Sequence, residues 1–310
     1  MPNETPKKGA VTGKIEREQA SPLTAHDREQ ILASNLQKAT ERLSIVSEQR
    51  TLCADMLAAH ICHREAPPEI LFTEFLKSAD SPDEVSRAIF CRTYAQSRAK
   101  EEALRPEHLF GVAELPPAGA HGKIAFVRNR YNERAYDLFA ATIKSTKPIY
   151  VSDFSEACEA VFNGQCSHCI LPVENGTGGR LFSFYAMMDR YELKICAVTE
   201  VDEDDASESV RYALVGRSLP RPLTRTQHHM LEFSLTREDG SHLSALLSAA
   251  EALGASIQKI DFLPLEYDHS FYRVYFSVRL SVADAPALGT YLSLCYPNYT
   301  PIGFYAIVKH

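Results

Sequence analysis

The sequence has little that would place it in a membrane, on a nucleic acid or in an oxidising compartment. No apolar run in its 310 residues approaches the ~20 that a membrane-spanning helix needs. The first 22 residues contain no apolar signal-peptide core, so we expect a cytoplasmic protein. Lys and Arg number 33 against 40 Asp and Glu, and the net charge of −7 argues against nucleic-acid and membrane partners. Eight cysteines are too few for a disulfide framework and fit a reducing environment.

Signatures of cofactor and metal binding are also missing. The chain has no phosphate-binding loop and no dinucleotide fingerprint, so we expect no cofactor. Cys166 and Cys169 have C-x-x-C spacing, but zinc would need two more ligands and there is no second matching pair. His60, Cys62 and His63 could supply them only through a contact between distant segments. A redox C-x-x-C opens a helix, whereas this one enters a predicted strand, so we expect no metal and a buried apolar role for Cys169.

What the sequence does contain is enough apolar material for a core, since hydrophobic residues make up 45% and charged residues 24%. A chain of this length typically forms about two domains. Residues 1–24 are polar without apolar periodicity, which predicts a disordered tail. Three further changes of pattern follow along the chain, and each predicts a different architecture.

Residues 25–112 are predicted to form a helical domain. Apolar residues recur at spacings of three or four, and they are Ile31, Leu32, Leu36, Leu43, Val46 and Leu57. The pattern predicts a long helix over 27–64, because two prolines follow it. Shorter helices are predicted over 69–77 and from Asp83 to about Leu104. Such a unit would bury its apolar stripe best by pairing with a second copy.

Residues 121–217 are predicted to form an α/β lobe after a Pro- and Gly-rich linker. Short apolar runs alternate here with helical patterns, which implies a mostly parallel sheet covered by helices. The predicted strands are 123–127, 149–151, 169–173, 193–201 and 210–215, and the predicted helices are 133–143, 154–162 and 181–191. An acidic loop over 202–209 joins the last two strands.

Residues 227–310 give the clearest pattern. The predicted order is strand 229–235, helix 241–253, strands 256–262 and 271–280, helix 285–296 and strand 299–308. Gly254 fits the C-cap of the first helix. The order β-α-β-β-α-β is typical of a ferredoxin-like sandwich.

One motif in the α/β lobe resembles a known family. The run CILPVENGTGG at 169–179 is similar to the "LPIEN-S/T-x-x-G" strand-to-loop signature of prephenate dehydratases. A buried strand here ends in carboxylate, amide and hydroxyl groups, at the kind of edge where open α/β sheets bind ligands. A Gly-rich loop without a ligand is the alternative. The three-part order resembles the bifunctional chorismate mutase/prephenate dehydratase family, which carries a C-terminal ACT domain that binds phenylalanine.

This resemblance implies a multi-domain protein of mixed class: a chorismate-mutase-like helical unit, one α/β lobe like the first prephenate dehydratase lobe, and a βαββαβ ACT-like domain. It also implies ligand-binding candidates at Glu174, Asn175, Thr177, Gly178 and Arg211, and two further candidates, Arg128 and Arg130, lie near a strand end where they could bind an anion. Arg211 could hold a carboxylate in bidentate fashion. The two other arginines follow the first strand, where the family has a Gly-Pro-x-Gly turn.

The lobe departs from the family pattern at two points. The family inserts a second α/β lobe between the strands that match 193–201 and 210–215, and its active site lies between the lobes. Here the joining segment is too short for a lobe, so half of the cleft should be absent. Val210 occupies the threonine position of the family's "TRF" motif, whose hydroxyl is assigned to helping the leaving group depart. Valine has the shape but no proton donor, and a plain buried strand residue is the favoured interpretation.

The helical unit departs as well. The family mutases bind a dianionic ether with Arg and Lys side chains. In the family register Gln49 falls where a catalytic Arg belongs and His60 falls on the catalytic Lys, whereas Glu101 is compatible with the family. Possible remaining cations are Arg28, Arg50 and Arg64, although solvated helix-face charges explain them equally simply. We therefore expect little or no mutase activity.

The ACT-like segment keeps only part of its ligand motifs. The family's "GALxxxL" appears here as SHLSALL at 241–247, and its "ESRP" appears as DFLP at 261–264. The candidate ligand residues are His242, Leu243, Leu247 and Phe262, although the two leucines also fit a plain core role. Phenylalanine binding in the family manner is thus not expected, and a different small ligand at a dimer interface is the open alternative.

Together these features favour a degenerate relative of the family in phenylalanine-branch aromatic amino-acid metabolism. It would lack dehydratase activity and act as a small-molecule-binding, regulatory or assembly protein. The alternative is an active enzyme on chorismate, prephenate or a related cyclohexadiene acid with a rebuilt site. The expected partners are a small-molecule carboxylate or aromatic amino acid and a second copy of the chain, as a homodimer or higher oligomer, or an active homologue.

Overall fold

The computed structural model describes residues 25–110, 122–143, 145–174, 182–202, 209–218, 226–236, 243–265 and 268–308. The chain divides after Gln49 into two compact units, which are described separately. Asn175, Thr177, Gly178 and His242 lie outside the described residues. Among the helices in these ranges, none is long and apolar enough to span a bilayer.

The long helix α1 (Ala25–Cys62) matches the predicted one closely. It contains no Gly or Pro, and Ala, Leu, Glu, Gln, Lys and Arg dominate it, so its helix propensity is high throughout. Leu32, Leu36 and Leu43 are 68%, 70% and 70% exposed in the single chain. The apolar stripe that the sequence predicted is therefore uncovered in one copy.

The other helices of the N-terminal segment are α2 (Pro68–Ser78), α3 (Glu84–Ser97), the 3₁₀ turn η1 (Glu102–Leu104) and α4 (Pro106–Leu109). Asp83 caps α3 by accepting a hydrogen bond from the Ser86 N–H at 3.0 Å. The prediction that this helix continues to Leu104 is wrong, because it ends at Ser97. No large apolar residue lies between Tyr94 and Leu104, so a longer helix would have had no face to bury.

The lobe contains β1 (Lys123–Val127), α5 (Arg130–Thr142), β2 (Lys147–Val151), α6 (Phe154–Phe162), β3 (His168–Pro172), α7 (Phe182–Arg190), β4 (Lys194–Asp202) and β5 (Ser209–Gly216). Helices cover both faces of its strands: Phe126 packs with α5, and Ala125 packs with α6. Helix α5 begins three residues earlier than predicted. The Asn129 side chain accepts hydrogen bonds from two N–H groups of the first turn, so Arg130 lies in the helix and not in a turn.

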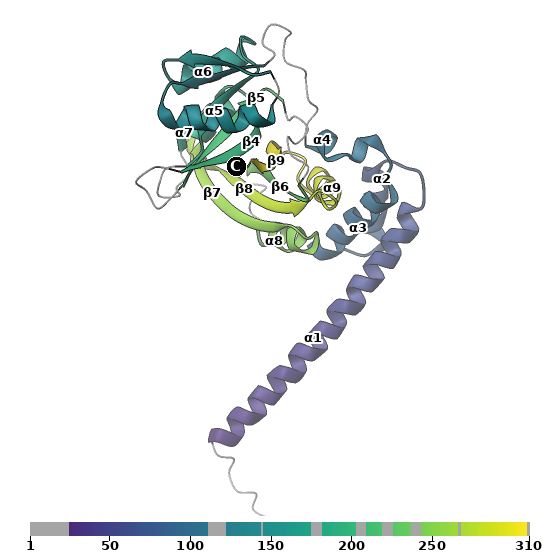
Figure 1. The fold of residues 1–310 in the computed structure, drawn as a ribbon. Helices are drawn as coiled ribbons and strands as arrows, with labels where there is room; N and C mark the ends of the chain where they lie inside the picture. Colours follow the sequence, from purple (N-terminus) through teal and green to yellow (C-terminus); the bar gives the residue numbers. More distant parts are fainter. Residues whose placement is uncertain are drawn as a thin grey trace, which may run out of the picture. The chain divides into compact units, whose positions relative to one another are not determined.

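The final segment contains β6 (His228–Thr236), α8 (Leu243–Ala252), β7 (Ser256–Leu265), β8 (Asp268–Ser281), α9 (Ala285–Cys295), β9 (Thr300–Tyr305) and β10 (Ile307–Val308). The β-α-β-β-α-β order is as predicted, and its strands lie in the order β9-β6-β8-β7. Figure 1 shows α8 and α9 beside these strands. The predicted single strand over 299–308 is in fact two, because the strand is interrupted at Ala306. Strand β9 pairs with β6 and β4, whereas β10 pairs with β4.

The strands of the described residues join one mixed ten-stranded sheet. Nine of them lie in the order β2-β1-β3-β5-β4-β9-β6-β8-β7, and β10 pairs with β4 outside this order. Strands β1, β2 and β3 are parallel, as predicted. Strand β5 runs antiparallel to both β3 and β4, so the lobe is less parallel than expected. Strand β4 meets β9 and β10, which joins the lobe to the final segment through backbone pairing.

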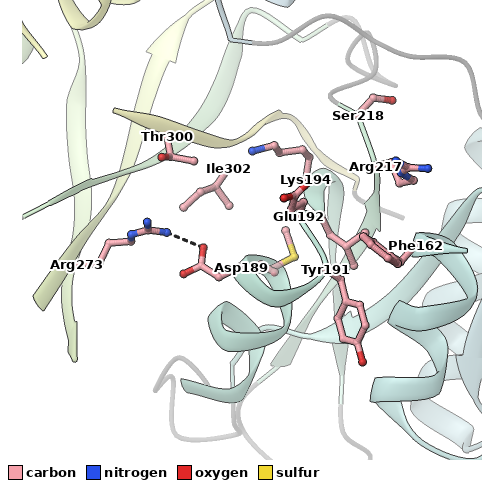
Figure 2. Close-up of a pocket in the computed structure, with 12 residues that line it drawn as sticks. Phe162, Asp189, Tyr191, Glu192, Lys194, Arg217, Ser218, Arg273, Thr300 and Ile302 are labelled. Atoms are coloured by element: carbon pink, nitrogen blue, oxygen red, sulfur yellow. Dashed lines mark hydrogen bonds and ion pairs between the residues drawn. The ribbon is translucent and has the colours of Figure 1, made fainter. Parts of the chain in front are cut away.

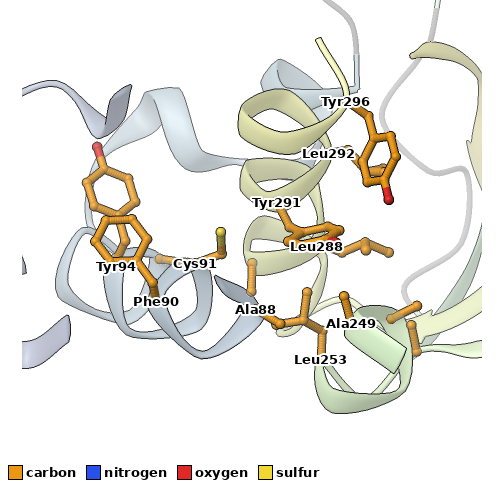
Figure 3. Packing of buried hydrophobic residues seen from close by; sticks show 14 of the residues in the cluster. Ala88, Phe90, Cys91, Tyr94, Ala249, Leu253, Leu288, Tyr291, Leu292 and Tyr296 are labelled. Atoms are coloured by element: carbon orange, nitrogen blue, oxygen red, sulfur yellow. The ribbon is translucent and has the colours of Figure 1, made fainter. Parts of the chain in front are cut away.

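The helices of residues 50–110 share their core with the final segment. Helix α3 packs against α8 and α9, and Figure 3 shows Ala88 and Cys91 of α3 among side chains of those helices. The Tyr291 hydroxyl donates a 2.7 Å hydrogen bond to Glu84 on α3. Because the apolar cluster is continuous, these helices and the final segment bury one another.

Candidate functional site

A row of side chains with alternating charge, here called the charge chain, lies at the end of β3 and comes from four strands. Its members are Glu200, Arg211, Glu174, Lys259 and Asp261. Glu174 lies just past β3, and its carboxylate is 3.7 Å from the Arg211 guanidinium on β5. Arg211 also donates to Glu200 on β4 at 3.1 Å. On the other side, Lys259 of β7 is 3.9 Å from Glu174 and 3.9 Å from Asp261. Glu174 therefore lies between two cations, one from the lobe and one from the final segment.

Strand pairing fixes this arrangement. The Val173 N–H donates to the Arg211 carbonyl at 2.8 Å, which sets the end of β3 against the start of β5. Glu200 and Arg211 are direct cross-strand neighbours in the β4–β5 hairpin. The Glu174 side chain is only 12% exposed, whereas those of Arg211 and Lys259 are 42% and 31% exposed. The carboxylate is therefore the shielded member of the cluster, and the cations face the surface.

Val210 is part of the hydrophobic core. It is 6% exposed and belongs to the cluster that contains Ile124, Phe126 and Phe139. Its cross-strand partner is Val201 on β4. A side chain in this environment packs against apolar neighbours and offers no proton. Strands β4 and β5 are adjacent and joined by six residues, so there is no inserted lobe between them.

The two arginines after β1 belong to a different environment. Arg128 is 3.4 Å from Glu133 on α5, and its guanidinium lies 5.0 Å from the Tyr150 ring centre on β2. Arg130 occupies the first turn of α5 and is exposed. Of the seven ligand-binding candidates, the structure thus brings Glu174 and Arg211 together and gives Arg128 other partners. Asn175, Thr177 and Gly178 are outside the described residues.

Of the four ACT-like ligand candidates, Leu243, Leu247 and Phe262 are described, and they lie in different environments. Leu243 packs against the core cluster behind the final segment's sheet, and Leu247 is half-buried. Phe262 is 58% exposed on β7, which forms one edge of the sheet. A core role is therefore the simpler one for Leu243, and Phe262 is a surface residue of the single chain.

Two of the three candidate cations of the helical segment, Arg50 and Arg64, are engaged in ion pairs, whereas Arg28 makes none with a described residue. Arg50 lies 2.8 Å from Asp83, and Arg64 pairs with Glu74. Glu101 is 3.3 Å from Arg98. These exposed pairs are worth little energetically, but each places a carboxylate where an anionic ligand would have to bind.

The cysteines of the C-x-x-C run are buried. Cys166 and Cys169 are 3% and 0% exposed, and burial raises the pKa of both thiols. In the described part of the chain, no group of three His, Cys, Asp or Glu side chains could hold a metal ion.

A cationic pocket opens beside the charge chain, with a cavity volume of about 720 Å³. Its floor is formed by Met230, Ser277 and Arg279, which face the same side of the final segment's sheet as Lys259. Arg211 of β5 lines the lobe side. None of its described lining residues is Asp or Glu, but Arg211 and Lys259 are paired with carboxylates of the charge chain. Arg279 is the lining arginine that makes no ion pair with a described residue, so an anion would bind there first.

Sequence reasoning found Glu174 and Arg211 but missed Glu200, Lys259 and Asp261. Glu200 has a visible signal, since a glutamate near the end of one strand and an arginine near the start of the next are a typical hairpin pair. Lys259 and Asp261 have no local signal, because they reach Glu174 only through the joining of the two halves of the sheet.

No family model and no curated relative matches the chain. Among solved structures, a prephenate dehydratase from Streptococcus mutans is similar over 60% of this chain and 99% of its own, with 17% identity and a TM-score of 0.51. A prephenate dehydratase in complex with L-Phe from Arthrobacter aurescens covers 60% of this chain and 90% of its own, with 14% identity and a TM-score of 0.46. GqqA, described as a quorum-quenching acylase, covers 60% and 95%, with 20% identity and a TM-score of 0.47. The fold is thus prephenate dehydratase-like.

Proposed function

We propose that this chain is a small-molecule-binding, regulatory or assembly protein of phenylalanine-branch aromatic amino-acid metabolism that lacks dehydratase chemistry. The observation that carries the proposal is the environment of Glu174. Its carboxylate is largely buried, 3.7 Å from the Arg211 guanidinium and 3.9 Å from the Lys259 ammonium, so it lies within a network of ion pairs. Val210, at the position of the family's threonine, is buried among apolar residues and has no proton to give to a leaving hydroxyl.

The cationic pocket supports the binding part of the proposal. Arg211, Lys259 and Arg279 approach it from the lobe and from the final segment, and Met230 and Ile307 add apolar surface. Guanidinium groups recognise carboxylates in bidentate fashion. A small-molecule carboxylate with a hydrocarbon body is therefore the ligand class that this pocket fits. Such a ligand would bridge the two halves of the sheet.

The assembly part of the proposal rests on α1. Leu32, Leu36, Leu43 and Val46 follow the alternating three- and four-residue spacing of a coiled-coil seam, and all are at least 60% exposed. Four large apolar side chains exposed along one helix face favour burial against another chain. We propose a second copy of this chain as the partner, which gives a homodimer.

One observation favours the alternative of an active enzyme with a rebuilt site. Strand β7 brings the Lys259 ammonium group to within 3.9 Å of Glu174. Lys259 could then supply a proton that Val210 cannot. In this alternative the substrate would be chorismate, prephenate or a related cyclohexadiene acid, held by Arg211 and Arg279.

The two readings are separated by incubating the full chain with chorismate or prephenate and following phenylpyruvate. We expect no turnover above background and an increase in thermal stability with a carboxylate ligand. The increase should be lost in Arg279→Gln and kept in Arg105→Gln, an exposed arginine of the helical segment. Turnover that disappears in Glu174→Gln would overturn the proposal and support the enzyme. No change in thermal stability with any carboxylate would leave assembly as the role.

A further inference from the structure

A second cavity, of about 670 Å³, lies at the opposite end of the strands from Glu174. It opens where β4 begins at Lys194 and β5 ends at Gly216, next to the ends of α6 and α7. Figure 2 shows Arg217 and Phe162 on one side of this cavity and Asp189 with Arg273 on the other. Neither the resemblance nor the comparisons assign a role to it.

The charged residues around this second cavity differ in the hydrogen bonds and ion pairs that they already make. Asp189 accepts hydrogen bonds from Arg273 at 2.8 Å and from the Tyr275 hydroxyl at 3.0 Å, so it is already used. Lys194 donates to the Pro301 carbonyl at 2.6 Å and has no carboxylate within ion-pair distance among the described residues. Burial lowers the pKa of Lys194, which is the direction expected of a partly desolvated ammonium group.

Arg217 and Glu192 are the remaining charged residues that line the second cavity. The Arg217 guanidinium lies 5.9 Å from the ring centre of Phe162 and makes no ion pair in the described part of the chain. Glu192 is exposed and attracts the Lys194 ammonium group electrostatically, without a hydrogen bond or a close ion pair to a described residue. The cavity therefore offers two cations and one carboxylate to a ligand.

A second feature of this cavity is the strained backbone of Glu192. Helix α7 ends with the Leu193 N–H bonded to the Met188 carbonyl at 2.9 Å, and Glu192 has a left-handed φ of 52°. Helices α6 and α8 end with the same type of bond, but their left-handed residues are Gly164 and Gly254. Glycine is strongly preferred at this position because it has no Cβ.

A glutamate at a position that favours glycine costs stability, and such costs concentrate at functional sites. The strained residue is also the carboxylate of the cavity lining that makes no hydrogen bond with a described residue, whereas Asp189 makes two. Apolar surface beside it comes from Met188, Phe162 and Ile302. These features are independent of the cationic pocket and of the charge chain at Glu174.

We infer that the second cavity binds a small zwitterion, with its ammonium group on Glu192 and its carboxylate on Lys194 and Arg217. An apolar body of the ligand would lie against Met188 and Phe162. Opposite charges at separate positions favour a molecule that carries both, because a ligand with one charge leaves the other protein group without a charged partner. The ligand class is therefore an α-amino acid with an apolar side chain.

The test is isothermal titration calorimetry of the full chain with L-leucine and L-phenylalanine, compared with 4-methylpentanoate and 3-methylbutylamine. Each of the last two carries one of the two charges. We expect an amino acid to bind at least about tenfold more tightly than either singly charged compound, as the loss of one charge-assisted hydrogen bond implies. Equal binding of the singly charged compounds, or no heat with either amino acid at millimolar concentration, would overturn the inference.

Variants of Glu192 distinguish binding from folding. Glu192→Gln should weaken amino-acid binding about tenfold or more, and Glu251→Gln, an exposed glutamate on α8, should not change it. Glu192→Gly should also weaken binding while raising the midpoint of thermal unfolding by about 2 °C, because the strain is removed. Wild-type affinity in either Glu192 variant would refute the site. A glycine variant less stable than the parent would refute the role of strain.

Discussion

A buried carboxylate at the centre of the sheet gives the sharpest test of how the two halves of the structure are held together. Glu232 on β6 is 1% exposed. It accepts a hydrogen bond from the Tyr305 hydroxyl on β9 at 2.5 Å and from the Tyr185 hydroxyl on α7 at 3.2 Å. Because Tyr185 belongs to the lobe and Glu232 to the final segment, this network crosses between them. The perturbation that we consider is Tyr305→Phe.

The geometry of the network sets how far Tyr305→Phe should lower the free energy of unfolding. Phenylalanine keeps the ring, so the substitution removes the hydroxyl and with it the hydrogen bond to Glu232. Removing one partner of a hydrogen bond costs about 1–3 kcal/mol when the other partner stays buried. We expect the short Tyr305 contact to lie in the upper half of that range, at about 2–3 kcal/mol. The longer Tyr185 contact should lie near about 1.5 kcal/mol. For a unit of this size, 2 kcal/mol corresponds to a fall of about 4–8 °C in Tm.

Urea unfolding followed by far-UV circular dichroism measures these differences, since the chain has no tryptophan to report by fluorescence. Tyr150→Phe is the matched control, because this tyrosine is 50% exposed and should change stability by less than about 0.5 kcal/mol. The double variant of Tyr185 and Tyr305 should be non-additive by more than about 0.5 kcal/mol, since both share one acceptor. If Tyr305→Phe were as stable as Tyr150→Phe, the network would not hold the halves together.

Two further predictions concern the long helix and the buried thiols. Leu36→Glu combined with Leu43→Glu should convert the proposed dimer to a monomer in multi-angle light scattering, whereas Gln37→Glu should not; a monomeric parent chain would contradict the dimer. Burial raises the pKa of the Cys62 thiol to about 11 and that of Cys196 to about 12, from an ordinary value of 9.0. The unfolded chain loses these protons first, so the free energy of unfolding should fall as the pH rises above about 9. A urea midpoint that rises between about pH 9 and pH 10 would refute this sign, and Cys196→Ala should reduce the slope.

The candidate site could be read only in part from the sequence. Glu174 and Arg211 were found because a buried strand ends in polar residues and because a motif resembles a known one. The same reasoning placed Arg128 near them, but its side chain turns to Glu133 and Tyr150. A side chain just past a strand has several directions open to it, and packing decides among them. Lys259 entered the site from a strand more than eighty residues away in the chain.

The sequence by itself determined the elements, because periodicity, capping residues and prolines act over a few neighbouring positions. It predicted α1, the alternation of the lobe and the β-α-β-β-α-β order of the final segment. Only the tertiary structure decided that β4 pairs with β9 and β10, which makes two expected sheets into one. It also decided that α3 packs on α8 and α9. Free strand edges and apolar faces specify that a partner is needed, whereas the choice of partner depends on which edges and faces meet once the chain is compact.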